Sequence, residues 1–278
     1  MASTANLALA ATSGTRHQRH RESRGVTPAI RPARLSPTVL GVATLILGSA
    51  AWSDEASIMA IMRERLPDLT VHEVRSTPVD GVYAVETEND HTSKTVHAIG
   101  GGSHVIVGDL FALAPDGPIN LTEERRRARR RHLLSAVEPT DVIQYIPADA
   151  VHVLTVFTDV DCPYCRQFHE QLGTLHGYGI GVRYLAFPMA GEGSATWRRM
   201  ISAWCADDPR TALSRLKEGE SIPPATCADP VAQHYELASA LGAKGTPTLF
   251  TETGQRLSGY RPAAELAKTL GVLASSPE

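Results

Sequence analysis

The chain has 278 residues, of which 42% are hydrophobic and 21% are charged, and its formal net charge at pH 7 is −3. This length is sufficient for a sizeable hydrophobic core and for more than one domain. The sequence shows no internal repeat, no phosphate-binding loop and no catalytic triad pattern, so it gives no indication of the functions that depend on them.

Residues 1–53 have the features of a secretory signal peptide. Six arginines and a single acid occupy the first 34 residues, and the apolar stretch 39–51 follows. This stretch is short for a membrane span, and Ala51-Trp52-Ser53 offers small residues at the cleavage positions, so we expect export and cleavage near Ser53. An uncleaved membrane anchor is the alternative. Cleavage removes six arginines and one glutamate and changes the net charge from −3 to −8, which leaves an acidic mature chain.

Residues 54–118 are expected to form a small α+β domain. Short apolar runs separated by turn signals predict strands over residues 69–74, 81–87, 95–99 and 104–111. A sheet of this size with little apolar surface is marginally stable alone, so we expect it to pair with a second copy of the chain. The alternative is a monomeric β domain that packs on the remainder of the chain.

Residues 119–140 are expected to form a linker helix, with Thr122 as a plausible N-cap. The segment is strongly basic, and its six arginines are Arg125, Arg126, Arg127, Arg129, Arg130 and Arg131. Such a cluster could bind nucleic acid or anionic lipid. Because the expected mature chain is acidic and exported, we favour a solvated linker helix and no nucleic-acid partner.

Two cysteines, Cys162 and Cys165, directly follow the apolar run 151–157. Two thiols one helical turn apart, where a strand leads into a helix, suit dithiol redox chemistry. Pro163 fits the first helical position and leaves Cys162 at the N-cap, where the helix macrodipole together with S–H and N–H donors favours a thiolate. We therefore expect Cys162 to attack disulfides and Cys165 to resolve the resulting mixed disulfide.

Other interpretations of this pair were zinc binding and an inert structural disulfide. A closed zinc site usually needs a second close pair, but Cys205 and Cys227 are 22 positions apart, so no metal or cofactor is expected. His169, four residues after Cys165, is expected to lie on a solvated helix face. The carboxylate of Asp161 opposes the Cys162 thiolate, by less than about half a pKa unit.

Residues 141–278 show the pattern of an α/β unit. The expected elements are strands over 151–157, 180–187, 245–250 and 255–260, helices over 163–175 and 231–241, a helical segment over 195–219, and a last helix from about residue 262. The order strand, helix, strand implies a parallel pair. The sequence thus predicts a thioredoxin fold with a helical insertion between its halves.

Pro247 begins one of these strands, and a proline there is most simply a strand-entry residue, because it cannot donate to the ladder. Beside a dithiol, the sharper interpretation is a cis proline that faces the cysteines and exposes the backbone of Thr246 to an extended substrate. In an exported chain, Cys205 and Cys227 suggest a second cysteine pair, which is either a structural bridge or a second redox pair.

Several stretches together resemble the bacterial periplasmic disulfide isomerases of the DsbC/DsbG type. They are 156–165, 182–188, Trp204-Cys205-Ala206, 238–247 and Gly259-Tyr260. The resemblance implies an N-terminal homodimerisation domain, a helical linker, a thioredoxin-fold catalytic domain and a structural bridge between Cys205 and Cys227. It also implies recycling by a membrane reductase of the DsbD type. Pro163 is closer to the DsbG-type dipeptide, whereas residues 185–188 are closer to DsbC.

We expect a periplasmic disulfide isomerase that acts on misfolded or mis-oxidised secreted proteins, with chaperone activity in a dimer cleft. The expected substrate contacts are made by Pro163, Tyr164, Thr246 and Pro247. Two alternatives stay open at this point, namely a dithiol oxidase and a holdase chaperone with secondary redox activity.

Overall fold

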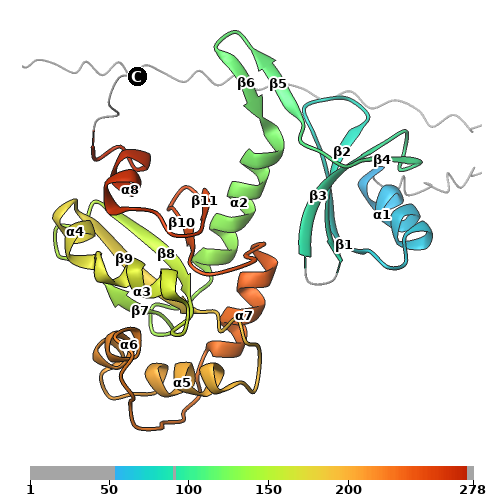
Figure 1. The fold of residues 1–278 in the computed structure, drawn as a ribbon. Helices are drawn as coiled ribbons and strands as arrows, with labels where there is room; N and C mark the ends of the chain where they lie inside the picture. The colour runs from blue at the N-terminus through green and yellow to red at the C-terminus, as the bar shows by residue number, and fades with distance from the viewer. Residues whose placement is uncertain (1–53, 90–91, 274–278) are drawn as a thin grey trace, which may run out of the picture. The chain divides into compact units, whose positions relative to one another are not determined.

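The computed structural model describes residues 54–89 and 92–273, so the expected signal peptide 1–53 lies outside the described residues (Figure 1). Helix α1 (Asp54–Arg65) comes first, and an antiparallel sheet in the order β1-β2-β3-β4 follows it. The strands are β1 (Thr70–Ser76), β2 (Val82–Asn89), β3 (Thr92–Ile99) and β4 (His104–Ile106). The buried side chains of Ile58 and Met62 on α1 pack against sheet residues that include Val71 and Val85, which gives this domain its own small core.

Two parts of this domain differ from the sequence-based expectation. An α+β domain was expected, but its helix was not assigned to residues 54–65, although Ile58 and Met62 are four residues apart and lie on one face. The expected strand 104–111 is confirmed only over its first three residues, because β4 ends at Ile106 and a separate hairpin of β5 (Phe111–Ala114) and β6 (Gly117–Asn120) follows. Gly108 and Asp109 interrupt the apolar run between them, which explains the break.

Helix α2 (Leu121–Ser135) occupies the expected linker segment. Its N-cap is Asn120, whose side chain accepts a hydrogen bond from the backbone N–H of Glu123, so the expectation of Thr122 as N-cap is wrong. Thr122 is buried, and its hydroxyl accepts a hydrogen bond from the Leu110 N–H instead. Asn and Thr are both good N-cap residues, which is why the sequence alone does not separate them.

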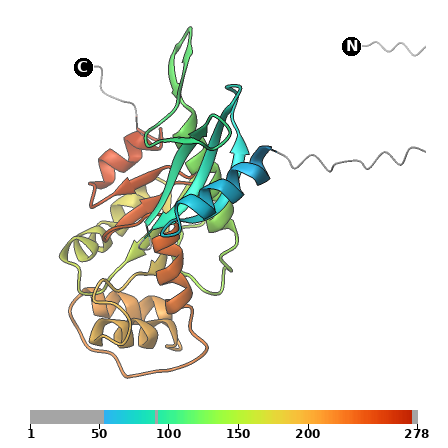
Figure 2. The same cartoon turned by 90° about the vertical axis from the view of Figure 1, so that its right-hand side faces the viewer.

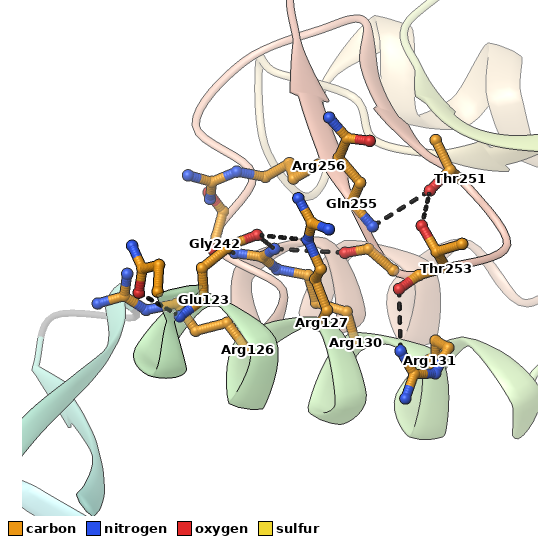
Figure 3. Close-up of polar contacts among 12 residues, drawn as sticks. Glu123, Arg126, Arg127, Arg130, Arg131, Gly242, Thr251, Thr253, Gln255 and Arg256 are labelled. Carbon is orange, nitrogen blue, oxygen red and sulfur yellow. Dashed lines mark hydrogen bonds and ion pairs between the residues drawn. The ribbon is translucent and has the colours of Figure 1, made fainter. Parts of the chain in front are cut away.

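The arginines of α2 are not merely solvated, which corrects the expectation of a solvated linker. Arg129 donates to the carbonyl oxygen of Ala240 at 2.8 Å, and Arg131 donates to that of Thr253 at 3.0 Å. Arg130 is buried, and it donates to Glu123 at 2.8 Å and to the Gly254 carbonyl at 3.3 Å (Figure 3). Helix α2 is therefore fastened to the following domain by guanidinium–carbonyl hydrogen bonds.

The second domain contains a five-stranded sheet in the order β11-β10-β8-β9-β7. Its strands are β7 (Ile143–Tyr145), β8 (His152–Thr158), β9 (Ile180–Ala186), β10 (Thr248–Phe250) and β11 (Arg256–Ser258). Strands β8 and β9 are parallel, as predicted, and β10 runs antiparallel to β8. The expected thioredoxin fold is confirmed, whereas the short edge strand β7 was not expected.

Helices of this domain are shorter than expected. The helix predicted over 163–175 is divided at Gln171 into α3 (Pro163–Glu170) and α4 (Leu172–Gly177). The helical segment predicted over 195–219 is two helices, α5 (Ala195–Trp204) and α6 (Pro209–Lys217), because Asp208 and Pro209 start a new helix. Figures 1 and 2 both show this pair beyond one end of the sheet.

Helix α7 (Val231–Ala240) ends before Gly242, as predicted, and α8 (Ala263–Thr269) closes the fold. The predicted bridge between Cys205 and Cys227 is present, and it ties the end of α5 to the segment before α7. One apolar core unites the sheet and the insertion, and its fully buried members include Leu154, Phe168, Tyr184, Met200 and Leu213. This core fixes the end of β8, from which the cysteine pair follows.

Candidate dithiol active site

The two cysteines are placed by the end of strand β8 and the start of helix α3. Strand β8 ends at Thr158, and Cys162 is the N-cap of α3, with Pro163 in the first turn, as predicted. Cys162 is half-buried, whereas Cys165, one turn further along, is 1% exposed. One sulfur is therefore accessible, and the other lies beneath it.

The environment separates the two thiols electrostatically. A hydrogen bond from the Cys165 side chain is the largest influence on Cys162, and it outweighs burial to lower the pKa of Cys162 to about 5. The Thr246 side chain and the N–H groups of Tyr164 and Cys165 lower this pKa further. Burial, followed by the hydrogen bond to Cys162, raises the pKa of Cys165. Cys162 is thus set up as a thiolate at neutral pH, and Cys165 as a thiol.

This tuning refines the prediction from the sequence. The helix start contributes N–H donors, but the sulfur of Cys162 makes no regular capping hydrogen bond, and the partner thiol contributes more. The carboxylate of Asp161, expected to oppose the thiolate, is engaged with the guanidinium of Arg199 and the hydroxyl of Thr196. Arg166 lies 3.7 Å from the same carboxylate. The two guanidinium groups and the Thr196 hydroxyl partly compensate the negative charge of Asp161, so this charge destabilises the Cys162 thiolate less.

The loop before β10 lies directly against the nucleophile. The Thr246–Pro247 peptide bond is cis, as predicted, and the sulfur of Cys162 lies 3.2 Å from the carbonyl oxygen of Thr246, to which it donates only in its protonated form. A hollow next to this loop is lined by Thr246 and Pro247 together with Lys244 and Gly259. Tyr164 is 62% exposed, and Pro163 is also exposed. The structure therefore brings together all four residues that we predicted to contact substrate.

Sequence reasoning missed a set of polar side chains beneath the cysteines. The carboxylate of Asp159 is buried and accepts hydrogen bonds from the N–H groups of Asp161 and Met189, which fixes the loop that leads to Cys162. Lys217 is 4% exposed and donates to the Thr158 hydroxyl at 2.5 Å and to the Asp159 carbonyl at 2.8 Å.

A signal for Lys217 is present in the sequence. Lys217 lies four residues after Leu213 on helix α6, and Leu213 is fully buried, so the lysine falls on the apolar face of an amphipathic helix.

His169 is not a solvated residue, which corrects the expectation made from its position on the helix. One ring nitrogen lies 3.2 Å from the Tyr184 hydroxyl, and the other lies 3.0 Å from that of Ser214. Burial, assisted by the charge of Lys217, lowers the pKa of His169 to about 4, so the ring is neutral at physiological pH.

Within residues 54–89 and 92–273 there is no cluster of three histidine, cysteine or acidic side chains suited to hold a metal ion. Among the same residues, no helix combines the length and the apolar character that a membrane span requires.

Comparisons with known proteins agree with the site. A family model described as the disulfide bond isomerase protein N-terminal domain matches residues 49–123, and a thioredoxin-like domain matches residues 140–274. The thiol:disulfide interchange protein DsbC of Dickeya dadantii is 34% identical over 227 residues, which cover 82% of this chain and 91% of that protein. The chain belongs to the DsbC family of thiol:disulfide interchange proteins.

A second DsbC protein is similar over most of its length. The protein of the same name from Escherichia coli K12 is 32% identical over 79% of this chain and 89% of its own length. Among solved structures, a disulfide interchange protein from Neisseria gonorrhoeae is 25% identical and matches 48% of this chain and 97% of that chain, with a TM-score of 0.43. As a member of the DsbC family, this chain is a thiol:disulfide interchange enzyme, and its cysteine pair lies within the thioredoxin-like match.

Proposed function

We propose that this DsbC-family enzyme isomerises incorrect disulfides in secreted proteins, with Cys162 as the nucleophile. The observation that carries the proposal is the pairing of an accessible sulfur, whose pKa is lowered to about 5, with a buried thiol one helical turn away. The Cys162 thiolate attacks one sulfur of a protein disulfide, forms a mixed disulfide and releases the other sulfur as a thiolate.

The mixed disulfide can then be resolved in two ways. A second substrate thiolate attacks the substrate sulfur and regenerates Cys162, so the substrate ends with a new disulfide and no net oxidation. Alternatively, Cys165 attacks Cys162, which releases a reduced substrate and leaves the Cys162–Cys165 disulfide. Isomerisation is therefore sustained only while the pair is kept reduced. We propose that a membrane reductase of the DsbD type performs this reduction in the periplasm.

The loop at Thr246–Pro247 supports a mode of substrate binding. The Thr246 carbonyl lies 3.2 Å from the nucleophilic sulfur, so an extended peptide that hydrogen-bonds to this backbone would hold its own sulfur close to Cys162. The exposed Pro163 and Tyr164 present apolar surface on the helix side of the same sulfur. Recognition through backbone hydrogen bonds and apolar contact tolerates many sequences, as an enzyme for misfolded proteins requires.

The N-terminal domain supports a homodimer. Large apolar side chains are exposed on β4, on the residue after it and on the β5–β6 hairpin, and they include Val107 at 78% and Leu113 at 90%. Strand β4 is also an edge of its sheet. An exposed edge next to exposed apolar residues favours association of two copies, and the space between two catalytic domains would then hold unfolded chains.

The dimer is tested by measuring mass in solution by sedimentation. We expect the wild-type chain to sediment as a dimer and the double variant Val107→Lys, Leu113→Lys as a monomer. Val79→Lys is the matched control, because Val79 is also exposed in this domain but lies in the turn before β2. Dissociation by Val79→Lys alone, or a dimer that survives the double variant, would argue against this surface.

The isomerase proposal is tested by two measurements on the cysteine pair. Thiol trapping in cells should find the Cys162–Cys165 pair mostly reduced, whereas a mostly oxidised pair would indicate an oxidase. Cys162→Ala should abolish the refolding of a substrate with scrambled disulfides and leave the suppression of aggregation largely intact. Refolding activity that survives in Cys162→Ala would indicate that the chain acts mainly as a holdase.

A further inference from the structure

A buried lysine beneath the active site needs an explanation that the proposed function does not supply. Lys217 on α6 is 4% exposed, and its two hydrogen bonds go to uncharged oxygens, the Thr158 hydroxyl at 2.5 Å and the Asp159 carbonyl at 2.8 Å. The ammonium also lies 5.9 Å from the centre of the Tyr184 ring. Burial of a cation without a paired carboxylate is costly. A compensating anion is therefore expected at some stage of the reaction.

The buried thiol supplies such an anion. The Thr158 hydroxyl accepts a hydrogen bond from the Nζ atom of Lys217 at 2.5 Å, and hydrogen bonding by the same side chain lowers the pKa of Cys165, so one hydroxyl group lies between the lysine and the buried sulfur. The charge of Lys217 also favours the thiolate of Cys165. Cys165 has to lose its proton to resolve a mixed disulfide, although burial disfavours its ionised form.

We propose that Lys217, acting through the hydroxyl of Thr158, is a positioning residue that takes up the proton of Cys165 and stabilises its thiolate during resolution. The inference rests on the proposed role of Cys162 as the attacking sulfur. It assigns a function to Lys217 and Thr158, both of which lie outside the cysteine motif, and it concerns only the second half of the exchange.

The step balances in atoms and electrons. In the mixed disulfide, the proton of Cys165 passes to the Thr158 oxygen, and the hydroxyl proton of Thr158 passes to the uncharged amine of Lys217. The Cys165 thiolate then attacks the Cys162 sulfur, which forms the Cys162–Cys165 bond and breaks the bond to the substrate. The substrate sulfur is reduced and leaves as a thiolate, the enzyme pair is oxidised, and the Lys217 ammonium returns its proton to the departing thiolate or to water.

The charges around Lys217 are compatible with this proton transfer. Burial lowers the pKa of Lys217 to about 8, so a fraction of the side chain is an uncharged amine near neutral pH. The titratable groups around Lys217 come from two sides. Asp159 and Tyr184 lie on the side of the sheet, and Cys162, Cys165, Arg166 and His169 lie on α3 or at its N-cap. Arg166 lowers this pKa, whereas the two cysteines and Asp159 raise it.

The test separates attack from resolution. Reduced protein is mixed with dithiobis(nitrobenzoate), which is an aromatic disulfide, and the release of thionitrobenzoate is followed by stopped-flow absorbance. The first equivalent reports attack by Cys162, and the second reports resolution of the Cys162 mixed disulfide by Cys165. Loss of an opposite charge raises a thiol pKa by about 1 to 3 units. Each unit lowers the thiolate fraction tenfold but raises its nucleophilicity about threefold.

Lys217→Met should therefore slow the second phase by roughly 3- to 30-fold and leave the first phase nearly unchanged. Its second phase should also lack the inflection near pH 8 that we expect for the wild type. The control Lys268→Met removes one exposed lysine of α8 and should change neither phase. Equal slowing of both phases, or an unchanged second phase, would show that Lys217 has a structural role only.

A second pair of variants covers the case in which Lys217→Met does not fold. Thr158→Val keeps the shape of the side chain and should slow the second phase, whereas Thr158→Ser keeps the hydroxyl and should stay within about twofold of the wild type. Similar rates for Thr158→Val and Thr158→Ser would overturn the relay. The same assay tests the proposed role of Cys162 separately from that of Lys217. If Cys162 is not the attacking sulfur, Cys162→Ala will retain the first phase.

Discussion

The sulfur of Cys162 lies 3.2 Å from the carbonyl oxygen of Thr246, although the two residues are 84 positions apart in the chain. Strand β10, which follows Thr246, is paired with β8, and β8 leads into the cysteine motif, so adjacent strands of one sheet set this distance. The nucleophile and the backbone proposed to bind the substrate are thus held by two adjacent, largely buried strands.

The lowered pKa of Cys162 predicts a pH-dependent contribution to the stability of the reduced protein. The folded pKa of about 5 lies below the unfolded value of about 8.5. The thiolate therefore contributes stability that is fully present above about pH 8.5 and is lost as the pH falls through 5. Relative to Cys162→Ser, reduced wild type should gain stability as the pH rises between these values.

Urea unfolding of both proteins in the presence of a reductant, at several pH values in this window, measures the difference. Cys165 does not disturb the comparison, because its raised pKa keeps it protonated in the folded state throughout the window. A difference that stays constant with pH would contradict the lowered pKa.

The ion pair between Arg199 and Asp161 predicts a small effect on the nucleophile. Arg199→Met leaves Asp161 with weaker compensation next to Cys162, and the pKa of Cys162 should rise by about half a unit or less. Thiolate absorbance against pH measures this shift. Arg198→Met removes the same charge from an exposed neighbour that donates to a backbone carbonyl instead, and it should have no effect. An equal shift in both variants would point to net charge and not to the pair.

Removal of the bridge between Cys205 and Cys227 should lower the stability of the protein without slowing the attack by Cys162. Replacing both cysteines with alanine releases a loop of 22 residues in the unfolded chain and should lower the free energy of unfolding by about 3 kcal/mol. The rate of attack by Cys162 should be unchanged at 25 °C, because the bridge lies in the segment between α5 and α7. A parallel loss of the attack rate would indicate that this pair takes part in the exchange.

Because α2 packs against the turn at Gly254, replacing Gly254 with alanine should lower the free energy of unfolding more than the same change at a glycine with open space around it. Gly254 has a φ of +79°, and a Cβ atom there would overlap the carbonyl oxygen of Arg127 on α2. Gly271 has a φ of +77° and open space around it, so it is the matched control. Gly271→Ala should cost about 1–2 kcal/mol of backbone strain, and Gly254→Ala should cost about 1–3 kcal/mol more because of the overlap. Equal losses in equilibrium unfolding would contradict the docked position of α2.

Much of the fold could be predicted, because it depends on local patterns. The apolar runs that became β8 and β9 and the Pro163 helix start follow from short stretches of sequence, whereas the cis bond before Pro247 was predicted only in combination with the distant cysteine pair. Helix α1 was missed because its apolar residues form a continuous run at 58–62 and are not spaced along one helical face, and Ile58 and Met62 are buried only once the sheet is in place. The β5–β6 hairpin was missed because Phe111–Ala114 is an uninterrupted apolar run without the alternation of apolar and polar residues that marks a half-buried strand.

The candidate site was predictable in its sulfur chemistry and not in its surroundings. The spacing of Cys162 and Cys165 indicates which thiol attacks, but the buried Lys217 lies more than fifty residues away in an inserted helix. A charged residue at the end of a helix is usually solvated, and only the packing of α6 against the core buries this one. The arginines of α2 are a similar case, since their carbonyl partners at the end of α7 and in the turn after β10 come more than a hundred residues later.

The rate of alkylation of reduced protein by iodoacetamide, followed from acid to alkaline pH with the modified residue identified by mass spectrometry, tests the central claim most directly. The account predicts modification of Cys162 alone, with an inflection of the rate near pH 5. An inflection near the ordinary thiol value of about 8.5, or modification of Cys165 in place of Cys162, would contradict it.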